Sequence, residues 1–169
     1  MPLLEVGKLK RSRGKRIAYH GSEILPPLPV AGEEIKPARP VEYRLSLTNA
    51  GDAIVVDGTI LAELDVCCNR CLSSLVYPLE APFQETYYDS ALPQPDGAQA
   101  DWVPFSGEQI NITPEVVQTM LLHLPMRFIC REDCLGLCPV CGADLNKNPC
   151  RCVQDEPDPR LAKLKDLLS

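Results

Sequence analysis

Nine cysteines are the feature of this 169-residue sequence that most constrains its fold, because six of them lie between Cys130 and Cys152. The count is odd, several cysteines are spaced as Cys-x-x-Cys, and the N-terminus lacks an apolar stretch followed by a small-residue cleavage site. This combination argues against a secreted disulfide framework and favours metal ligation in a reducing compartment. No run of about 18 apolar residues is present, so we expect no membrane partner. The sequence therefore predicts a cytoplasmic protein with metal-binding cysteines.

The strongest motif pairs Cys138 and Cys141, which are followed by Gly142, with Cys150 and Cys152. Two cysteines separated by two residues can ligate one tetrahedral ion, with sulfur atoms about 2.3 Å from zinc. Gly142 suits the tight turn after the second cysteine, and the residues before Cys150 are numerous enough to reverse the chain. The sequence thus predicts a closed structural zinc site from these four cysteines, with free buried thiols as the alternative.

Two alternating runs predict a long β-hairpin with cysteines at its tip. Pro78 and Pro82 fall out of phase with the apolar residues of the second run, which predicts an edge strand because proline cannot donate to a ladder. Residues 41–48 alternate as well and predict another half-buried strand, followed by turn residues at 49–52. The apolar positions of the hairpin are Ile60, Ala62, Leu64 and Val66 before the tip, and Leu75, Tyr77, Leu79, Ala81 and Phe83 after it.

The hairpin tip supplies a second set of cysteines, Cys68 and Cys71, for which Cys130 and Cys134 are candidate partners. The four could form another tetrahedral site, so that eight cysteines fill two sites. Cys67 would then be left over, since it points to the opposite side of a strand from Cys68. Two alternatives stay open for Cys68 and Cys71: free thiols, or a redox dithiol that would make the protein a thiol oxidoreductase. Redox pairs usually precede a helix N-terminus, which lowers the thiol pKa, whereas a strand follows here.

Outside the hairpin the patterns are less regular. A helix is predicted to begin with Thr113 as N-cap and Pro114 in the first helical position, and to stop before Pro125. Prolines and glycines predict a loop over residues 89–107, and six prolines in residues 1–40 predict short strands and connectors. A short C-terminal helix is expected after Asp158. No internal repeat of useful length is visible.

Charge is unevenly distributed along the chain, whose formal net charge is −6. Residues 1–20 carry six basic side chains against one acidic side chain, whereas residues 42–110 carry eleven acidic side chains against two arginines. Because phosphate contacts need lysine and arginine, the acidic body is poorly suited to gripping RNA and better suited to a basic protein. The basic N-terminal segment could contact RNA or be a solvated stretch.

Motifs for catalysis are lacking. The chain has no P-loop, no GxGxxG and no Ser-His-Asp pattern, and its only histidines are His20 and His123. His123 lies at the end of the predicted helix, where a surface position is expected. We therefore expect a protein that is not an enzyme.

The cysteine motifs and the elements between them resemble the bacterial YceD family. The resemblance extends over most of the chain from about residue 20, and the C-terminal cysteine block is its most specific part. This family is associated with accumulation of large-subunit (23S) ribosomal RNA, and its genes often neighbour that of a large-subunit ribosomal protein. The resemblance implies a non-catalytic, cytoplasmic ribosome biogenesis factor. It is carried by Cys68-Asn69-Arg70-Cys71-Leu72, the helix over residues 110–124, the segment from Cys130 to Asn146, and the tail from Asp158 to Leu164.

Together these patterns predict an α+β protein: an antiparallel sheet that could close into a barrel-like shape, one main helix and a C-terminal zinc knuckle. The expected domains are residues 1–128, a cysteine-rich segment at 129–153 and a tail at 154–169. One or two structural zinc ions are the expected cofactor. A large-subunit ribosomal protein or precursor ribosomal RNA is the expected partner, and the oligomeric state stays open.

Overall fold

The structure is a computed structural model that describes residues 3–30, 33–92 and 102–152. It divides the chain into two compact units, the first comprising residues 1–67 and 74–128, the second residues 68–73 and 129–169. The sequence assigned the hairpin tip to the first domain, whereas the structure groups it with the cysteine-rich segment. The predicted tail of residues 154–169, with the helix expected after Asp158, lies outside the described residues.

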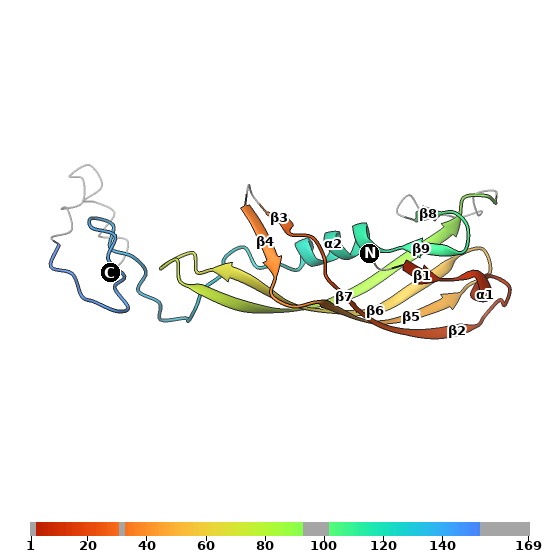
Figure 1. Ribbon diagram of the computed structural model, residues 1–169, viewed down its shortest axis with the longest axis horizontal. Helices are drawn as coiled ribbons and strands as arrows, with labels where there is room; N and C mark the ends of the chain where they lie inside the picture. Colours follow the sequence, from red (N-terminus) through yellow and green to blue (C-terminus); the bar gives the residue numbers. More distant parts are fainter. Residues whose placement is uncertain (1–2, 31–32, 93–101, 153–169) are drawn as a thin grey trace, which may run out of the picture. The chain divides into compact units, whose positions relative to one another are not determined.

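The first unit holds every named strand and helix of the described chain (Figure 1). No helix in the described residues is long and apolar enough to cross a membrane. In chain order the elements are β1 (Leu3–Glu5), α1 (Gly7–Lys10), β2 (Arg16–Glu23), β3 (Leu28–Val30), β4 (Glu33–Pro37), β5 (Val41–Asn49), β6 (Ile54–Cys67), β7 (Ser74–Asp89), β8 (Val103–Phe105), β9 (Gln109–Asn111) and α2 (Thr113–Leu122).

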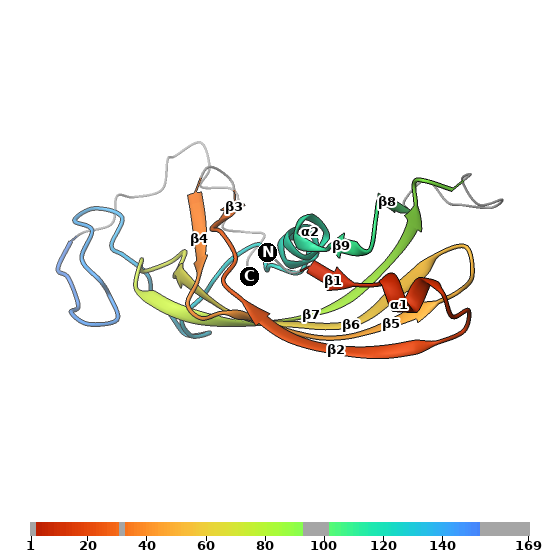
Figure 2. The same ribbon diagram turned by 45° about the vertical axis from the view of Figure 1, so that its right-hand side comes forward.

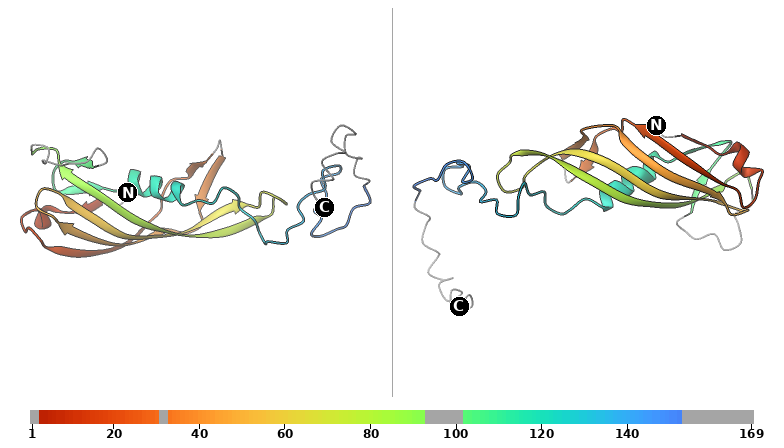
Figure 3. Two further views of the ribbon diagram at one scale, coloured as in Figure 1. Left: turned by 180° about the vertical axis from the view of Figure 1, so that it is seen from behind. Right: turned by 90° about the horizontal axis from the view of Figure 1, so that it is seen from below.

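Four antiparallel strands in the order β2-β5-β6-β7 build the main sheet. The short strand β4 pairs with β6 near the hairpin tip, β3 pairs with β4, and β8 runs parallel to the end of β7. Among the described residues β2 pairs only with β5, so the sheet is open and no closed barrel forms (Figure 3). The α+β class fits, and the barrel-like shape does not.

The hairpin predicted from alternation is present, with β6 and β7 in continuous register from Ile54↔Tyr87 to Cys67↔Ser74. The alternating apolar residues face one side, because β-strands point successive side chains to opposite faces; all are buried except Leu75 and Tyr77 near the tip, which are partly buried. Pro78 and Pro82 pair with β6, and in the described residues β7 has no second neighbour before Tyr87. The edge-strand prediction is therefore confirmed.

One face of the sheet is covered and the other is bare. The helix α2 and the β1–β9 pair lie on the same side of the sheet (Figure 2). Val116 and Met120 of α2 are fully buried against the inward residues of the strands, among them Phe83 and Tyr87. No described element covers the opposite face, which carries the polar phase of each strand.

The helix α2 differs slightly from its prediction at the N-terminus. Ile112 is the N-cap and contributes no side-chain hydrogen bond, so the assignment of Thr113 to this position is wrong by one residue. The capping acceptor comes from Asn111, whose Oδ1 accepts the backbone N–H of Thr113 at 3.0 Å. The helix ends at Leu122, before Pro125, and His123 is exposed as expected.

The loop expected over residues 89–107 is only partly a loop in the described residues. β8 lies inside this range and adds to the end of β7 through three residue pairs. The pairing could not be seen in the sequence because such a short strand has no alternation of its own.

The basic N-terminal segment is a packed part of the first unit. Leu4, Val6 and Leu9 are buried in the hydrophobic core, and β1 pairs with β9. The side chain of Asn49, which is itself buried, donates to the carbonyl of Leu9 at 2.7 Å. The segment is therefore anchored by apolar burial, which its charge had obscured.

Half of the basic side chains in this segment are tied to the acidic body. Lys10 forms an ion pair with Asp89, Arg11 with Glu108 at 3.3 Å, and Arg16 with Asp57 at 3.1 Å. The hydrogen bond from Lys10 also lowers the pKa of the Asp89 carboxyl. The prediction of a separate basic segment beside an acidic body is therefore wrong, because the basic side chains of residues 1–20 partly neutralise the acidic side chains of the body.

Candidate metal centres

The second unit has no hydrophobic core of its own in its described residues. Its only buried side chains are those of four cysteines, Cys68, Cys71, Cys134 and Cys138. The apolar side chains of the unit are largely exposed, with Leu72 and Leu135 each 66% accessible. Ordering a backbone segment costs about 1–2 kcal/mol per residue. Something other than apolar burial must offset this cost.

Eight of the nine cysteines gather into two groups of four. The hairpin quartet comprises Cys68, Cys71, Cys130 and Cys134, and the C-terminal quartet comprises Cys138, Cys141, Cys150 and Cys152. Within each quartet all four sulfur atoms lie within 4.8 Å of one another. Cys67 belongs to neither group and is exposed, and all nine cysteines are free of disulfide bonds. Both quartets could therefore hold a metal ion.

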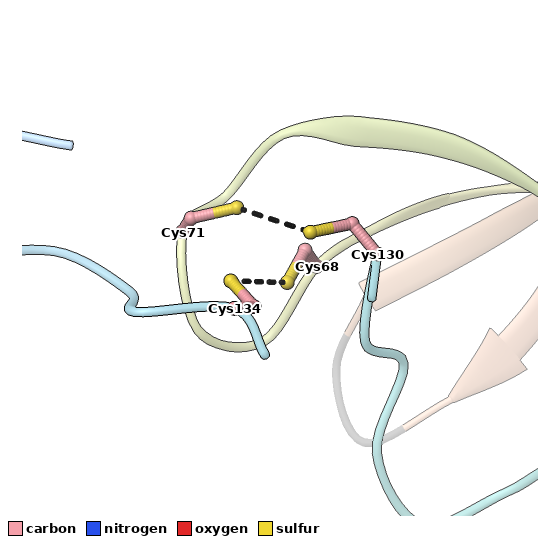
Figure 4. A group of neighbouring side chains, drawn as sticks. All are labelled: Cys68, Cys71, Cys130 and Cys134. Atoms are coloured by element: carbon pink, nitrogen blue, oxygen red, sulfur yellow. Dashed lines mark hydrogen bonds between the residues drawn. The ribbon is translucent and has the colours of Figure 1, made fainter. Parts of the chain in front are cut away.

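The hairpin quartet has the dimensions of a tetrahedral four-sulfur site (Figure 4). The Sγ atoms of Cys68 and Cys134 are 3.9 Å apart, and those of Cys71 and Cys130 are 3.7 Å apart. Four sulfurs placed about 2.3 Å from a tetrahedral zinc ion stand about 3.8 Å from one another. The side chains in Figure 4 point toward a common centre from the hairpin tip and from the chain after α2. The donor set and its spacing fit a closed site.

The two Cys-x-x-Cys turns, which begin at Cys68 and Cys138, have the same pattern of backbone hydrogen bonds. In each turn, the N–H of the first cysteine donates a hydrogen bond, and its carbonyl and its sulfur each accept one. The matching hydrogen bonds run from Cys68 N to Ser73 O and from Cys138 N to Ala143 O (both 2.8 Å), from Leu72 N to Cys68 O and from Gly142 N to Cys138 O (both 2.9 Å), and from Arg70 N to Cys68 Sγ and from Val140 N to Cys138 Sγ (both 3.4 Å).

Both turns place the residue after the second cysteine in the left-handed region. Gly142 has a φ of 72° there, as the sequence suggested, and Leu72 has a φ of 59° at the equivalent position. Leu72 is the only residue other than glycine with positive φ in the described chain. This conformation costs a leucine roughly 1–2 kcal/mol, and its exposed side chain gains little packing in return. The turn itself must therefore hold Leu72 in place.

Backbone hydrogen bonds favour the thiolate form of the first cysteine in each turn. A hydrogen bond from the backbone of Cys130 is the largest cause that lowers the pKa of Cys68 to about 6. In the other turn, a backbone hydrogen bond from Cys141, the second cysteine of that turn, is the largest cause that lowers the pKa of Cys138 to about 6. Burial raises the pKa of Cys130 to about 11. A side-chain hydrogen bond with Ser73 lowers the pKa of Cys71 as well, so each quartet contains at least one sulfur predisposed to be the thiolate that metal binding requires.

A single asparagine connects the two quartets. Asn146 lies between the second and third cysteines of the C-terminal quartet, and its Nδ2 donates to the sulfur of Cys134 in the hairpin quartet at 3.5 Å. Its Oδ1 accepts the backbone N–H of Leu135 at 2.9 Å and the guanidinium of Arg131 at 2.8 Å. Asp144 holds Asn146 in turn, accepting its Nδ2 at 2.7 Å. Residues outside the ligand set therefore orient the Cys134 sulfur.

The hairpin tip is also fastened to the segment between the quartets. The carbonyl of Arg70 accepts the N–H of Leu137 at 3.0 Å, and its guanidinium donates to the carbonyl of Cys134 at 3.0 Å. Gly136 has a φ of 77°, and a Cβ there would approach the Arg70 carbonyl to 3.0 Å. The chain can pass this close to the tip only because position 136 is glycine.

Replacing Asn146 by alanine should weaken metal retention at the hairpin quartet. Residues that orient a metal ligand through hydrogen bonds typically contribute about 10- to 100-fold in metal affinity. We expect the metal affinity of the hairpin quartet to fall about tenfold. The measurement is the chelator concentration that removes half of the metal bound there. Asn148→Ala is the matched control, because it makes the same change in the same loop, where Asn148 is exposed and bonds to Asp144 through its backbone. Equal metal retention in the two variants would contradict the role assigned to Asn146.

The structure brings together the same two groups of four that the cysteine spacing predicted. Sequence reasoning missed three contributors: Asn146 beside Cys134, Leu72 in its left-handed conformation, and the Arg70 contacts. Only Gly142 carried a recognisable signal, because glycine commonly occupies positive φ. The repeated turn was missed because its two copies share little beyond their cysteines.

The family model described as large ribosomal RNA subunit accumulation protein YceD matches residues 56–168, which includes both quartets. The chain belongs to the YceD family. The match begins at β6, later than the resemblance from about residue 20 had suggested.

Several curated proteins are similar to this YceD-family chain. A protein of Mycobacterium tuberculosis is 31% identical over 131 residues, covering 76% of this chain and 62% of its own length. YlbN of Bacillus subtilis is 29% identical, covering 80% of this chain and 78% of its own length. The chloroplastic YCED homolog 1 of Arabidopsis thaliana, named as a large ribosomal RNA subunit accumulation protein, is 23% identical, covering 76% of this chain and 48% of its own length. The chain thus spans about three fifths of the mycobacterial relatives. No solved structure matches it.

Proposed function

We propose that this chain is a non-catalytic ribosome biogenesis factor that supports the accumulation of large-subunit (23S) ribosomal RNA in the cytoplasm. The observation that carries the proposal is the family match, which covers residues 56–168 and so includes parts of both units. The names of the family and of the Arabidopsis relative refer to accumulation of the large ribosomal RNA subunit, which supports this part of the proposal.

The proposal assigns a structural role to both cysteine quartets, each holding one zinc ion. Four thiolates complete the coordination of zinc and leave no open position for a substrate, as is usual for structural rather than catalytic sites. When bound, the ions would supply folding free energy to a unit in whose described residues the only buried side chains are those of cysteines. Asn146 and Arg70 orient the segment around Cys134 through hydrogen bonds to its sulfur and its carbonyl.

A protein partner is favoured over bare RNA as the first contact. Three of the six basic side chains in residues 1–20 are already paired with carboxylates of the same unit. The remaining three could neutralise only a few phosphates, each adding about 0.7–0.9 to the slope of log affinity against log salt. A basic large-subunit ribosomal protein would instead meet the acidic surface with favourable steering.

The thiol oxidoreductase alternative gains no support. Cys68 and Cys71 lie in a turn with no helix after it, and each sulfur lies against a third cysteine rather than being an isolated pair. In the described residues, no feature distinguishes Cys68 and Cys71 from the other cysteines as a redox pair.

The test is to delete the gene for this chain in its host and to measure the ratio of large-subunit to small-subunit ribosomal RNA. We expect this ratio to fall and to recover when the wild-type chain is restored. A Cys134→Ser chain should fail to restore it, whereas Cys67→Ser, which changes the cysteine outside both quartets, should succeed. An unchanged ratio after removal would contradict the proposed function.

A further inference from the structure

The uncovered face of the main sheet carries a pocket that the proposed function does not yet use. It lies entirely within the first unit and has a volume of about 470 Å³. Its middle is a row of three directly paired positions on adjacent strands: Glu42 on β5, Leu61 on β6 and Glu80 on β7. The pocket therefore has an apolar centre flanked by two carboxylates.

The surroundings of this row strengthen both properties. Pro40 and Pro78 add apolar surface beside Leu61, and Glu63 adds a third carboxylate. The one cation that lines the pocket is Arg39, which pairs with Glu63 at 3.3 Å. Three carboxylates against one guanidinium leave a net charge of −2. Within the described part of the chain, Glu42 and Glu80 have no ion-pair partner.

Long basic side chains match this combination of surfaces. Lysine and arginine have an aliphatic stem that packs on apolar surface and a charged head that stays at a polar rim. Placed in the pocket, the stem would cover Leu61 and the prolines, and the head would reach Glu42 or Glu80. Phosphate groups of RNA would meet the same carboxylates with repulsion.

The edge of the sheet restricts how a partner can approach. β7 is the neighbouring edge strand, and its prolines at 78 and 82 have no N–H to offer to an added strand. A partner segment therefore cannot extend the sheet along this stretch by a continuous hydrogen-bonded ladder. It must bind through side chains that enter the pocket.

We infer that this pocket is the docking site for a lysine or arginine side chain of an extended, basic segment of a protein partner. The inference deepens the proposed function, on which it rests only for the identification of that partner as ribosomal. A basic segment would place one of its cations in the pocket, between Glu42 and Glu80.

The binding test uses the full metal-loaded chain and a fluorescein-labelled oligolysine peptide, with fluorescence anisotropy at low ionic strength. The pocket variant combines Glu42→Gln and Glu80→Gln, and the matched control combines Glu34→Gln and Asp52→Asn, exposed acids outside the pocket. Two exposed charge pairs account for about a 2- to 30-fold change in affinity. We expect the pocket variant to bind roughly tenfold more weakly and the control to bind nearly as the wild type does.

A second variant, Leu61→Lys, places a cation inside the pocket without changing a carboxylate. It should weaken peptide binding to a similar extent, while circular dichroism shows the wild-type thermal transition. Equal weakening in the pocket variant and in the control would overturn the inference, because binding would then follow net charge alone. Tighter binding of an RNA oligonucleotide than of oligolysine to the wild-type chain would overturn it as well.

The cellular readout separates this inference from the proposed function. If removal of the chain lowers large-subunit ribosomal RNA and the Glu42→Gln/Glu80→Gln chain restores it fully, the pocket is not the docking site and the proposed function stands. If removal has no effect on ribosomal RNA while the pocket variant loses peptide binding, the pocket stands and its ribosomal partner does not.

Discussion

Removing metal from the chain under reducing conditions should unfold the second unit and leave the first folded. The described residues of the second unit bury no side chains other than those of cysteines, so little apolar burial remains once the ions are gone. Structural zinc sites contribute on the order of 10–16 kcal/mol of apparent binding free energy near neutral pH. The first unit has its own core, built from the inward faces of β5, β6 and β7 and from α2.

Hydrogen exchange before and after chelation measures this directly. Amides of residues 129–152 should lose their protection, whereas those of β5 and β6 should keep theirs. Restoring zinc should restore the protection, which separates reversible metal loss from oxidation of the thiols. Unchanged exchange over residues 129–152 in the metal-free, reduced chain would contradict a metal-dependent fold for this unit.

Deleting residues 1–11 should destroy the stability of the first unit. The deletion removes three side chains of the core, Leu4, Val6 and Leu9, which are at most 1% exposed. Each buried side chain of this size contributes about 1.5–3 kcal/mol, so the loss is roughly 5–9 kcal/mol, against a total stability of about 5–15 kcal/mol for a typical domain. We expect the cooperative urea transition to disappear or to move to a much lower midpoint.

Charge substitutions provide the control for this deletion. Arg11→Gln breaks an exposed ion pair with Glu108 and should change the free energy of unfolding by about 1 kcal/mol or less. Any contribution of these basic residues to RNA binding must therefore be tested with such substitutions, since a deletion would confuse binding with folding. A truncated chain with a wild-type urea midpoint would show that the segment is a dispensable arm.

The parts of the fold that the sequence revealed are those with a long, regular period. In β5, β6 and β7, apolar and polar residues alternate over many positions. One set faces the core and the other faces solvent, so the two faces of each strand could be assigned before the structure was known. β4 pairs with β6 through only two residues and β8 with β7 through three, so both depend on tertiary neighbours. The ion pairs of Lys10 and Arg11 join residues far apart in the sequence. Net charge over a range of residues cannot show such pairing.

The candidate metal centres show the same division. Cysteine spacing indicated which sulfurs belong together, because ligand reach depends on short separations along the chain. Asn146 had no such signal, since its contact with Cys134 depends on how the intervening segment folds back. Leu72 stands where glycine would be expected, and the conformation of this residue became evident only from its φ.

Whether both quartets bind zinc is measured by native mass spectrometry of the reduced, purified chain together with elemental analysis. We predict two zinc ions per wild-type chain, two in the Cys67→Ser variant, and fewer than two in the Cys134→Ser variant. A reduced, folded chain without zinc, or one whose quartets are joined by disulfide bonds, would contradict this prediction.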